Sequence, residues 1–310
     1  MDTIRALVAD PSAPGRLSLR EVAAPKPAPS EAVVTVEAVS LNRGEVRALQ
    51  TAEEGWRPGW DLAGVVAEAA ADGSGPRTGA PVVGLTRQGA WAEQVAVATN
   101  LLAHRPASVS AAVAATLPVA GLTALRAVDL ADTVENRAVL VTGASGGVGR
   151  FAIQLAAQLG ADVTALVSSE ERGRPLVALG AAAFAVELPA DASFDLILDS
   201  VGGDVLGQAL QSVGPGGLIV SFGNSSGQPT TFDVSRFYPR DGARLYAFLI
   251  FSELSRSGSG AHDLGRLAVM AGEGHLDVGI GREAAWTEAA DVVEAFWQRK
   301  IAGKTVLHLS

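Results

Sequence analysis

The chain contains no cysteine among its 310 residues. This absence excludes disulfide bonds, a thiol nucleophile and cysteine-ligated zinc. Aromatic residues are also scarce, at 5%. No run of about 18 uninterrupted apolar residues occurs, so no segment is predicted to span a membrane. The opening stretch MDTIRALVADPSAPG lacks a long apolar core, and we therefore expect no signal peptide and a cytoplasmic protein.

Positive charge is in the minority. Lys and Arg number 24 against 33 Asp and Glu, which gives a formal net charge of −9. No basic cluster that could bind a phosphate backbone appears, so we expect a small-molecule partner and no nucleic acid. The four histidines are scattered without the spacing of metal ligands, and no metal site is predicted.

Hydrophobic residues make up 48% of the chain, enough for a large core. The first hundred residues are rich in strand-like runs such as EAVVTVEAVS and DLAGVVAEAA, separated by turn-forming stretches. Beyond about Ser110, apolar strands alternate with helical segments, which predicts a doubly wound parallel sheet. RLYAFLIF is expected to add a further strand, and GKTVLHL is expected to form the last one.

A glycine-rich turn lies in VLVTGASGGVGRFAIQLAAQLGA, between a strand and a helix. Ala144, Gly146 and Gly149 fit the spacing G/A-x-G-x-x-G, which lets backbone N–H groups and a helix N-terminus face a pyrophosphate. The alternative is a tight turn without a ligand. The residues predicted to contact the cofactor are Ala144, Ser145, Gly146, Gly147, Val148 and Gly149.

The same letters match the T-G-x-x-x-G-x-G signature of short-chain dehydrogenases. That family carries the signature near its N-terminus, whereas here it lies in mid-chain. It also needs a Tyr-x-x-x-Lys pair. The two tyrosines, Tyr238 and Tyr246, are followed four residues later by Gly242 and Ile250. The chain therefore lacks the acid/base pair of that family.

Motifs along nearly the whole chain resemble those of the medium-chain dehydrogenase/reductase superfamily, in its zinc-free quinone oxidoreductase branch. They occur in the expected order: VEAVSLNRGEV, PGWDLAGVVAE, GAWAEQVAV, LPVAGLTAL, VLVTGASGGVGRFAIQLA, FDLILDSVGG and GKTVL. The resemblance implies an α/β fold with a GroES-like, mostly β catalytic domain over 1–112. A Rossmann domain over 113–252 would follow, with a return to the catalytic domain over 253–310.

Zinc-dependent members of that superfamily carry a G-H-E motif and a lobe with four cysteines. Trp60 and Asp61 stand where the motif would place His and Glu, and only LTRQ separates Gly84 from Gly89, which leaves no room for the lobe. The resemblance therefore implies a zinc-independent enzyme. We expect Asp61 to bond the backbone or an arginine rather than to act as a base.

The cofactor is predicted to be NADPH rather than NADH. Ser168 and Ser169 occupy the position, about 20 residues past the glycines, where NAD sites place a carboxylate. Arg172 and Arg174 lie just beyond, and hydroxyl and guanidinium groups suit a 2′-phosphate. The two intervening glutamates are interpreted as an acidic helix start.

Five further cofactor contacts follow from the resemblance. Thr123 would lie near the nicotinamide or the phosphates, and Val201 would border the adenosine. Phe222, Gly223 and Asn224 would border the nicotinamide end, although Phe222 fits a core position equally well.

Without zinc, the favoured substrates are already electrophilic, namely quinones and α,β-unsaturated carbonyls. By resemblance, Asn42 would lie near the nicotinamide and donate a hydrogen bond; its structural alternative is a turn. Trp60 and Arg43 are candidates for the substrate pocket, as a wall and an anion binder, against core and surface alternatives. Tyr238 is a candidate proton donor, against an ordinary loop position.

Two other functions stay open. One is an enoyl-thioester reductase of fatty-acid or polyketide synthesis, although LNRGEVRALQTAEEGW lacks the tyrosine that some such reductases carry there. The other is a non-catalytic NADPH-binding sensor or structural protein. Because family members commonly dimerise through the last Rossmann strand, we expect a homodimer formed through RLYAFLIF.

Overall fold

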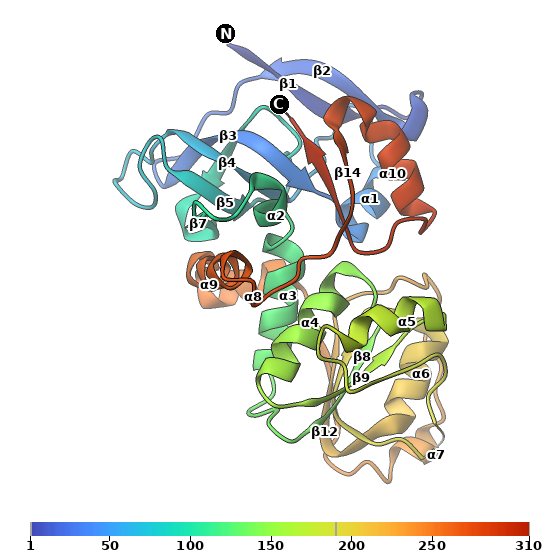
Figure 1. The fold of residues 1–310 in the computed structure, drawn as a ribbon. Helices are drawn as coiled ribbons and strands as arrows, with labels where there is room; N and C mark the ends of the chain where they lie inside the picture. Colours follow the sequence, from blue (N-terminus) through green and yellow to red (C-terminus); the bar gives the residue numbers. More distant parts are fainter. Residues whose placement is uncertain (1, 190, 310) are drawn as a thin grey trace. The chain divides into compact units, whose positions relative to one another are not determined.

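The computed structural model describes residues 2–189 and 191–309 (Figure 1). The chain divides into two compact units. The first combines the residues up to Leu122 with those from Leu254 onward, and the second runs from Thr123 to Glu253. The first boundary falls inside helix α3 (Pro118–Asp129), later than position 113, because the preceding short helix packs with the first unit.

The second unit is built on a six-stranded sheet in which every described pair is parallel. Its strand order is β10-β9-β8-β11-β12-β13. The strands are β8 (Ala138–Thr142), β9 (Asp162–Leu166), β10 (Ala183–Ala185), β11 (Phe194–Asp199), β12 (Val213–Ser221) and β13 (Arg244–Ala247). The helices are α4 (Gly147–Gln158), α5 (Glu170–Val177), α6 (Gly203–Ser212) and α7 (Val234–Phe237), while α8 (Ile250–Ser257) crosses the second boundary.

This sheet is the predicted doubly wound arrangement. Its central strands are buried apolar runs such as Val139–Val141, as expected of parallel strands covered on both faces. The chain moves outward from β8 to β9 and β10, then returns to β11 on the other side of β8. The strand order therefore reverses between β8 and β11, which is where ligands bind in folds of this class.

The first unit is mostly β. Its larger sheet has seven strands, in the order β14-β15-β3-β4-β5-β7 with β6 paired to β3, and β1 and β2 form a separate antiparallel pair. The strands are β1 (Thr3–Ala9), β2 (Leu17–Ala23), β3 (Glu31–Ser40), β4 (Asp61–Glu68), β5 (Pro81–Leu85), β6 (Gln94–Ala98), β7 (Leu102–His104), β14 (Ile280–Ala285) and β15 (Lys304–His308). The α-helices are α1 (Arg43–Leu49), α2 (Ala111–Ala115), α9 (Ala261–Gly272) and α10 (Ala289–Trp297), and short 3-10 turns occupy Pro14–Arg16, Thr99–Leu101 and Trp286–Glu288.

The register of this sheet places two charged residues on one face. Ser40 of β3 lies opposite Asp61 of β4 on one side and opposite Val306 of β15 on the other. Lys304 precedes Val306 by two residues and so shares its face. Asp61 and Lys304 are both buried, although they come from distant parts of the chain.

The expected strand RLYAFLIF is only half correct. Its first four residues form β13, but Ile250 begins helix α8. Ile250, Phe251 and Leu254 are buried and follow helical spacing, while Leu249 is 59% exposed. A short apolar run fits a strand or a buried helix equally well, and packing decided between them. Among the described residues, no helix combines the length and hydrophobicity needed to cross a bilayer.

Candidate functional site

The glycine-rich turn joins β8 to α4 in the second unit. Gly143 adopts a φ of +58°, and its carbonyl accepts a hydrogen bond from Gly146 N–H over 2.9 Å. Gly146 is the N-cap of α4, and its carbonyl accepts from Arg150 N–H over 3.0 Å. The N–H groups of the first helical turn, from Gly147 to Gly149, therefore have no partner within the helix. Ser145 and Val148 are half-buried beside them.

Gly149 has no room for a side chain. A Cβ at this position would lie 2.6 Å from the carbonyl oxygen of Ala144 and 2.7 Å from its Cα. Ala144 is fully buried, so the first turn of α4 packs directly on the backbone that leaves β8. This close packing is the role of the third glycine in a dinucleotide-binding turn. The residues present fit a pyrophosphate.

A buried carboxylate braces the neighbouring turn. Asp199, the last residue of β11, accepts hydrogen bonds from Thr142 Oγ1 over 2.7 Å and from the N–H groups of Val201 (3.3 Å) and Gly202 (3.1 Å). Burial raises the pKa of Asp199, and these hydrogen bonds oppose that rise. Thr142, the first residue of the match to the short-chain dehydrogenase signature, thus connects the C-terminal ends of β8 and β11.

The turn after β9 carries the residues expected to select the cofactor. Ser168 is exposed, and Ser169 is the N-cap of α5 without a side-chain cap hydrogen bond. Arg172 is half-buried in the first turn of that helix. Arg174 instead pairs with Glu170 over 3.0 Å, with both side chains exposed. Ser168, Ser169 and Arg172 thus lie in the turn after β9 and in the first turn of α5, and Arg174 forms an ion pair within the same helix.

The other predicted contacts lie at the C-terminal ends of strands or in α3. Val201 follows β11, and Phe222 N–H donates to the Asp199 carbonyl over 2.9 Å just past β12. A Cβ on Gly223 would lie 2.9 Å from the carbonyl oxygen of Ser200, so this glycine also marks a close approach. Asn224 is exposed, and its side chain accepts hydrogen bonds from Ser226 and Gly227 of its own loop. Thr123 is 5% exposed within α3.

Asn42 begins helix α1 in the first unit. It forms a reciprocal capping box with Glu45, in which Asn42 N–H donates to Glu45 Oε1 over 2.6 Å. This arrangement satisfies backbone groups at both positions. The segment around Asn42, for which a turn was the structural alternative, is therefore the start of a helix, and Asn42 is the N-cap residue.

A buried ionic network surrounds the Asn42 side chain. Lys304 Nζ donates to Asn42 Oδ1 over 2.9 Å and to the Leu41 carbonyl over 3.2 Å, and it lies 3.5 Å from Asp61 Oδ2. Asn42 Nδ2 donates to Asp61 Oδ2 over 2.8 Å and to Glu45 Oε1 over 3.3 Å. Asp61 Oδ1 accepts from Val119 N–H over 2.9 Å, so Asp61 has the backbone bond predicted for it, with lysine rather than arginine as its charged partner.

This network contains two carboxylates and a single ammonium group. Burial, and then the neighbouring Asp61 charge, raise the pKa of Glu45 well above its ordinary value. Burial also lowers the pKa of Lys304, although both carboxylates oppose this. Glu45 Oε2 is buried without a hydrogen-bond partner among the described residues. We assign a proton to Glu45, because protonation leaves one anion beside one cation.

The remaining predicted residues are spread over both units. Arg43 is half-buried, with its guanidinium 6.0 Å from the ring centroid of Trp297. Trp60 packs against Gly44 of α1, where an added Cβ would clash with the indole. Tyr238 follows α7 and is 76% exposed.

Glu45 and Lys304 were not among the site residues predicted from the sequence. The spacing N-x-x-E in LNRGEV is a capping-box signal that could have indicated Glu45. A lysine inside the closing apolar run GKTVLHL could have indicated a buried partner for Asp61. Within residues 2–189 and 191–309, no cluster of three or more His, Cys, Asp or Glu side chains is arranged to hold a metal ion.

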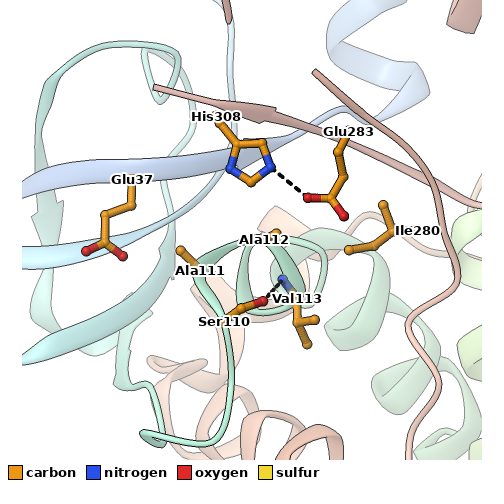
Figure 2. A pocket seen from close by; sticks show the side chains of 8 residues that line it. All are labelled: Glu37, Ser110, Ala111, Ala112, Val113, Ile280, Glu283 and His308. Atoms are coloured by element: carbon orange, nitrogen blue, oxygen red, sulfur yellow. Dashed lines mark hydrogen bonds and ion pairs between the residues drawn. The ribbon is translucent and has the colours of Figure 1, made fainter. Parts of the chain in front are cut away.

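A separate cavity of about 390 Å³ lies within the first unit (Figure 2). Glu283 and His308 meet there, with His308 Nε2 2.7 Å from Glu283 Oε2. Ser110 also lines it, but its hydroxyl caps helix α2 by accepting from Val113 N–H. No predicted site residue lines this cavity.

The chain is similar in sequence to known oxidoreductases. Residues 147–258 match the family described as zinc-binding dehydrogenase. The quinone oxidoreductase of Pseudomonas aeruginosa is 31% identical over 240 residues, which cover 71% of each chain. A chloroplastic quinone-oxidoreductase homolog of Spinacia oleracea is 38% identical over 161 residues, 47% of this chain and 49% of its own length. The chain thus spans about half the length of the chloroplast relatives it matches.

Among solved structures, the quinone oxidoreductase of Pseudomonas syringae pv. Tomato DC3000 has the same fold. The two chains superpose with a TM-score of 0.85 at 27% sequence identity, and the comparison covers 99% of this chain and 100% of that one.

Proposed function

Because the chain belongs to the quinone oxidoreductase family of the medium-chain dehydrogenase/reductase superfamily, we propose that it is an NADPH-dependent, zinc-independent oxidoreductase. Its substrates would be quinones or α,β-unsaturated carbonyls, which accept hydride at a conjugated system. The observation that carries the proposal is the turn from Gly143 to Gly149, whose close-packed glycine and open first helical turn suit a pyrophosphate.

NADPH is the proposed cofactor because the turn after β9 offers no carboxylate at the position of Ser168 and Ser169. When bound, the nicotinamide supplies the hydride, and the protein supplies position and electrostatics. The serine hydroxyls and Arg172 would hold the 2′-phosphate through charge-assisted hydrogen bonds. Arg174 is left out because it already pairs with Glu170.

Zinc independence is supported by the side chains available. The chain has no cysteine, and both oxygens of Asp61 are engaged by Val119, Asn42 and Lys304. Without a Lewis acid, the anion formed on hydride transfer needs a hydrogen-bond donor and a proton. Asn42 is the proposed donor: its 3.3 Å bond to Glu45 is the longer of its two, and exchanging it would free one N–H for a substrate oxygen.

The proton is proposed to come from water. Tyr238 stays the second candidate, since its exposed hydroxyl has no partner among the described residues. Trp60 and Arg43 are proposed to lie at the substrate pocket, Trp60 through its indole face and Arg43 through its charge.

A homodimer is also proposed. Strand β13 ends the parallel sheet, so one of its edges has no neighbour among the described strands. Leu245 on this strand is 52% exposed, and an unpaired apolar edge favours pairing with another chain.

The test is NADPH oxidation with a panel of simple quinones, enones and crotonyl-type thioesters. Turnover of quinones or enones, with a lower kcat/KM for NADH, is the expected result. Preference for the thioesters would instead support an enoyl-thioester reductase. Tight NADPH binding without turnover of any panel member would reject the enzyme proposal in favour of a non-catalytic NADPH-binding protein.

A further inference from the structure

Arg57 is a half-buried arginine without a counter-ion. It lies in the segment Arg57–Trp60 that leads into β4, and its Nε is buried without a hydrogen-bond partner. Within the described part of the chain, its guanidinium takes part in no hydrogen bond, ion pair or ring contact. An arginine is always charged at neutral pH, so this charge is partly removed from water and uncompensated.

Other arginines with a buried, partnerless Nε differ in one respect. Arg105 uses its other nitrogens to pair with Glu37 over 2.7 Å, and Arg240 donates to the Gln211 carbonyl. Arg126 and Arg150 also interact elsewhere. Arg57 therefore differs from the other four arginines, because none of its guanidinium nitrogens has an acceptor among the described residues.

The loop that hydrogen-bonds to the Arg57 backbone carries no acidic side chain to neutralise it. The Arg57 backbone carbonyl accepts from Gly89 N–H over 3.0 Å, and the neighbouring segment Thr86–Gly89 contains Arg87 but no acidic residue. Burial alone lowers the pKa of Arg57, with no charged neighbour contributing. A carboxylate close enough to form an ion pair would raise that pKa instead.

One face of the guanidinium is lined by backbone. A Cβ built on Gly89 would lie 3.8 Å from Arg57 Nε and 3.9 Å from its Cζ, which is ordinary packing distance. Gly89 has a φ of +83°, a conformation that favours glycine. The absence of a side chain at position 89 thus leaves only backbone in contact distance on this side of the guanidinium.

We propose that Arg57, flanked by Gly89, binds an anionic group of the substrate, either a carboxylate or a phosphate. The guanidinium presents its N–H donors in a fixed fork that matches both groups. Arg57 stands three residues before Trp60, the proposed wall of the substrate pocket. The identification of the ligand as substrate rests on the proposed function, whereas anion binding by Arg57 does not.

The proposal narrows the substrate class. A simple quinone or enone would leave Arg57 unpaired, and an anionic one would neutralise it. Two sources of the anion fit the chemistry: a carboxylate on the quinone or enone itself, or the phosphates of a coenzyme A thioester. Matched pairs of substrates separate these sources, namely benzoquinone against a carboxylated benzoquinone, and a crotonyl N-acetylcysteamine thioester against crotonyl-CoA.

Three variants test the role of Arg57. Arg57→Met keeps the stem and removes the charge, Arg57→Lys keeps the charge and removes the fork, and Arg77→Met removes an exposed arginine of the same unit as a control. In Arg57→Met we expect kcat/KM to fall about ten- to hundredfold for the anionic member of one substrate pair, mainly because KM rises. This range corresponds to the loss of a hydrogen bond to a charged group. The neutral partner of that pair should change less than about twofold. For the anionic substrate, the kcat/KM of Arg57→Lys should lie between those of the wild type and Arg57→Met. The kcat/KM of Arg77→Met should match that of the wild type.

A second measurement needs no turnover. Benzoate and inorganic phosphate should raise the Tm of the wild type and of Arg77→Met but not of Arg57→Met. Without added anion, the Tm of Arg57→Met should equal or exceed that of the wild type, because an uncompensated charge has been removed. If no panel substrate is reduced but this Arg57-dependent shift persists, the proposed function fails and the anion site stands.

Several results would overturn the inference. One is an Arg57→Met variant that keeps the wild-type response to anions or loses neutral and anionic substrates equally. Another is an Arg57→Met variant that unfolds at a lower Tm without anion, which would make Arg57 a structural residue. Equal losses in Arg77→Met would mean that net charge, rather than a site, attracts the anion.

Discussion

Lys304 holds the side chain of Asn42 by its oxygen, over 2.9 Å, although 262 residues separate the two in the sequence. Because an ammonium group can only donate, Asn42 must present Oδ1 to Lys304 and Nδ2 to Asp61. The orientation of the amide is therefore set by charge. The network serves both to begin α1 and to keep the proposed hydrogen-bond donor in one rotamer.

Removing the cation should cost much of the stability of the first unit. In Lys304→Met, the Asp61 carboxylate stays buried without its counter-ion, and we expect the free energy of unfolding to fall by about 3–5 kcal/mol. Urea unfolding followed by tryptophan fluorescence measures this loss. Lys300→Met, at an exposed position, is the control and should change stability little. A Lys304→Met variant as stable as Lys300→Met would contradict the network.

The proton assigned to Glu45 predicts a dependence on pH. The folded state holds this proton more tightly than the unfolded state, because the pKa of Glu45 is raised. The associated stability is fully present below the ordinary glutamate pKa and is lost as pH rises through the raised value. Glu45→Gln mimics the protonated form and should lose less stability than the wild type as pH rises above the ordinary glutamate pKa. Thermal unfolding at a series of pH values measures this difference. Glu68→Gln, at an exposed position, is the control and should follow the wild type. Parallel curves of Tm against pH for all three proteins would mean that Glu45 is ionised in the folded state.

The third glycine of the turn should tolerate no side chain. Gly149→Ala places a Cβ against the Ala144 backbone, which should cost about 1–3 kcal/mol of stability and shift the N–H groups away from the pyrophosphate. NADPH affinity, measured by calorimetry, should fall at least about tenfold. Gly265→Ala in α9 is the matched control, because its nearest neighbour would be 3.9 Å away. Unchanged NADPH affinity in Gly149→Ala would place the cofactor elsewhere.

Cofactor choice should respond to the turn after β9. Ser168→Asp combined with Arg172→Met introduces a carboxylate and removes a cation, so the ratio of kcat/KM for NADPH over NADH should fall about ten- to hundredfold. Arg174→Met serves as the control because that side chain is paired with Glu170. An equal effect of Arg174→Met would show that the phosphate is held by general charge.

The exposed edge of β13 should carry the dimer. Leu245→Glu places a charge on this edge, and we expect sedimentation velocity to show a shift from dimer to monomer at equal concentration. Val269→Glu, a similarly exposed residue of the first unit, should leave the dimer intact. A wild type that sediments only as a 31.6 kDa species would reject the dimer itself.

The features predicted correctly from the sequence are those determined by short, continuous stretches of the chain. The turn from Gly143 to Gly149 was predicted because a strand, a glycine spacing and a helix occur within one short stretch. The alternation of strands and helices gave the parallel sheet for the same reason. RLYAFLIF was only half right, because a short apolar run carries no period that separates a strand from a buried helix.

The network around Asn42 could not be read in the same way. Its members come from β3–α1, β4, α3 and β15, and only the antiparallel pairing of β3 with β4 and β15 brings them together. The sequence predicted that Asp61 is structural but not that Lys304 is its partner. A motif such as GKTVL shows that a lysine is present, whereas its contacts depend on register.

The position of Lys304 also bears on the order in which the chain folds during synthesis. The residues of the second unit leave the ribosome before Lys304 does, so that unit can fold first as a continuous segment. The first unit begins earlier but must wait, with Asp61 and Glu45 still hydrated, until its last strand is made. A protein interrupted before β15 would therefore combine a folded second unit with a first unit that lacks its last strand, which is a form that proteases and chaperones would recognise.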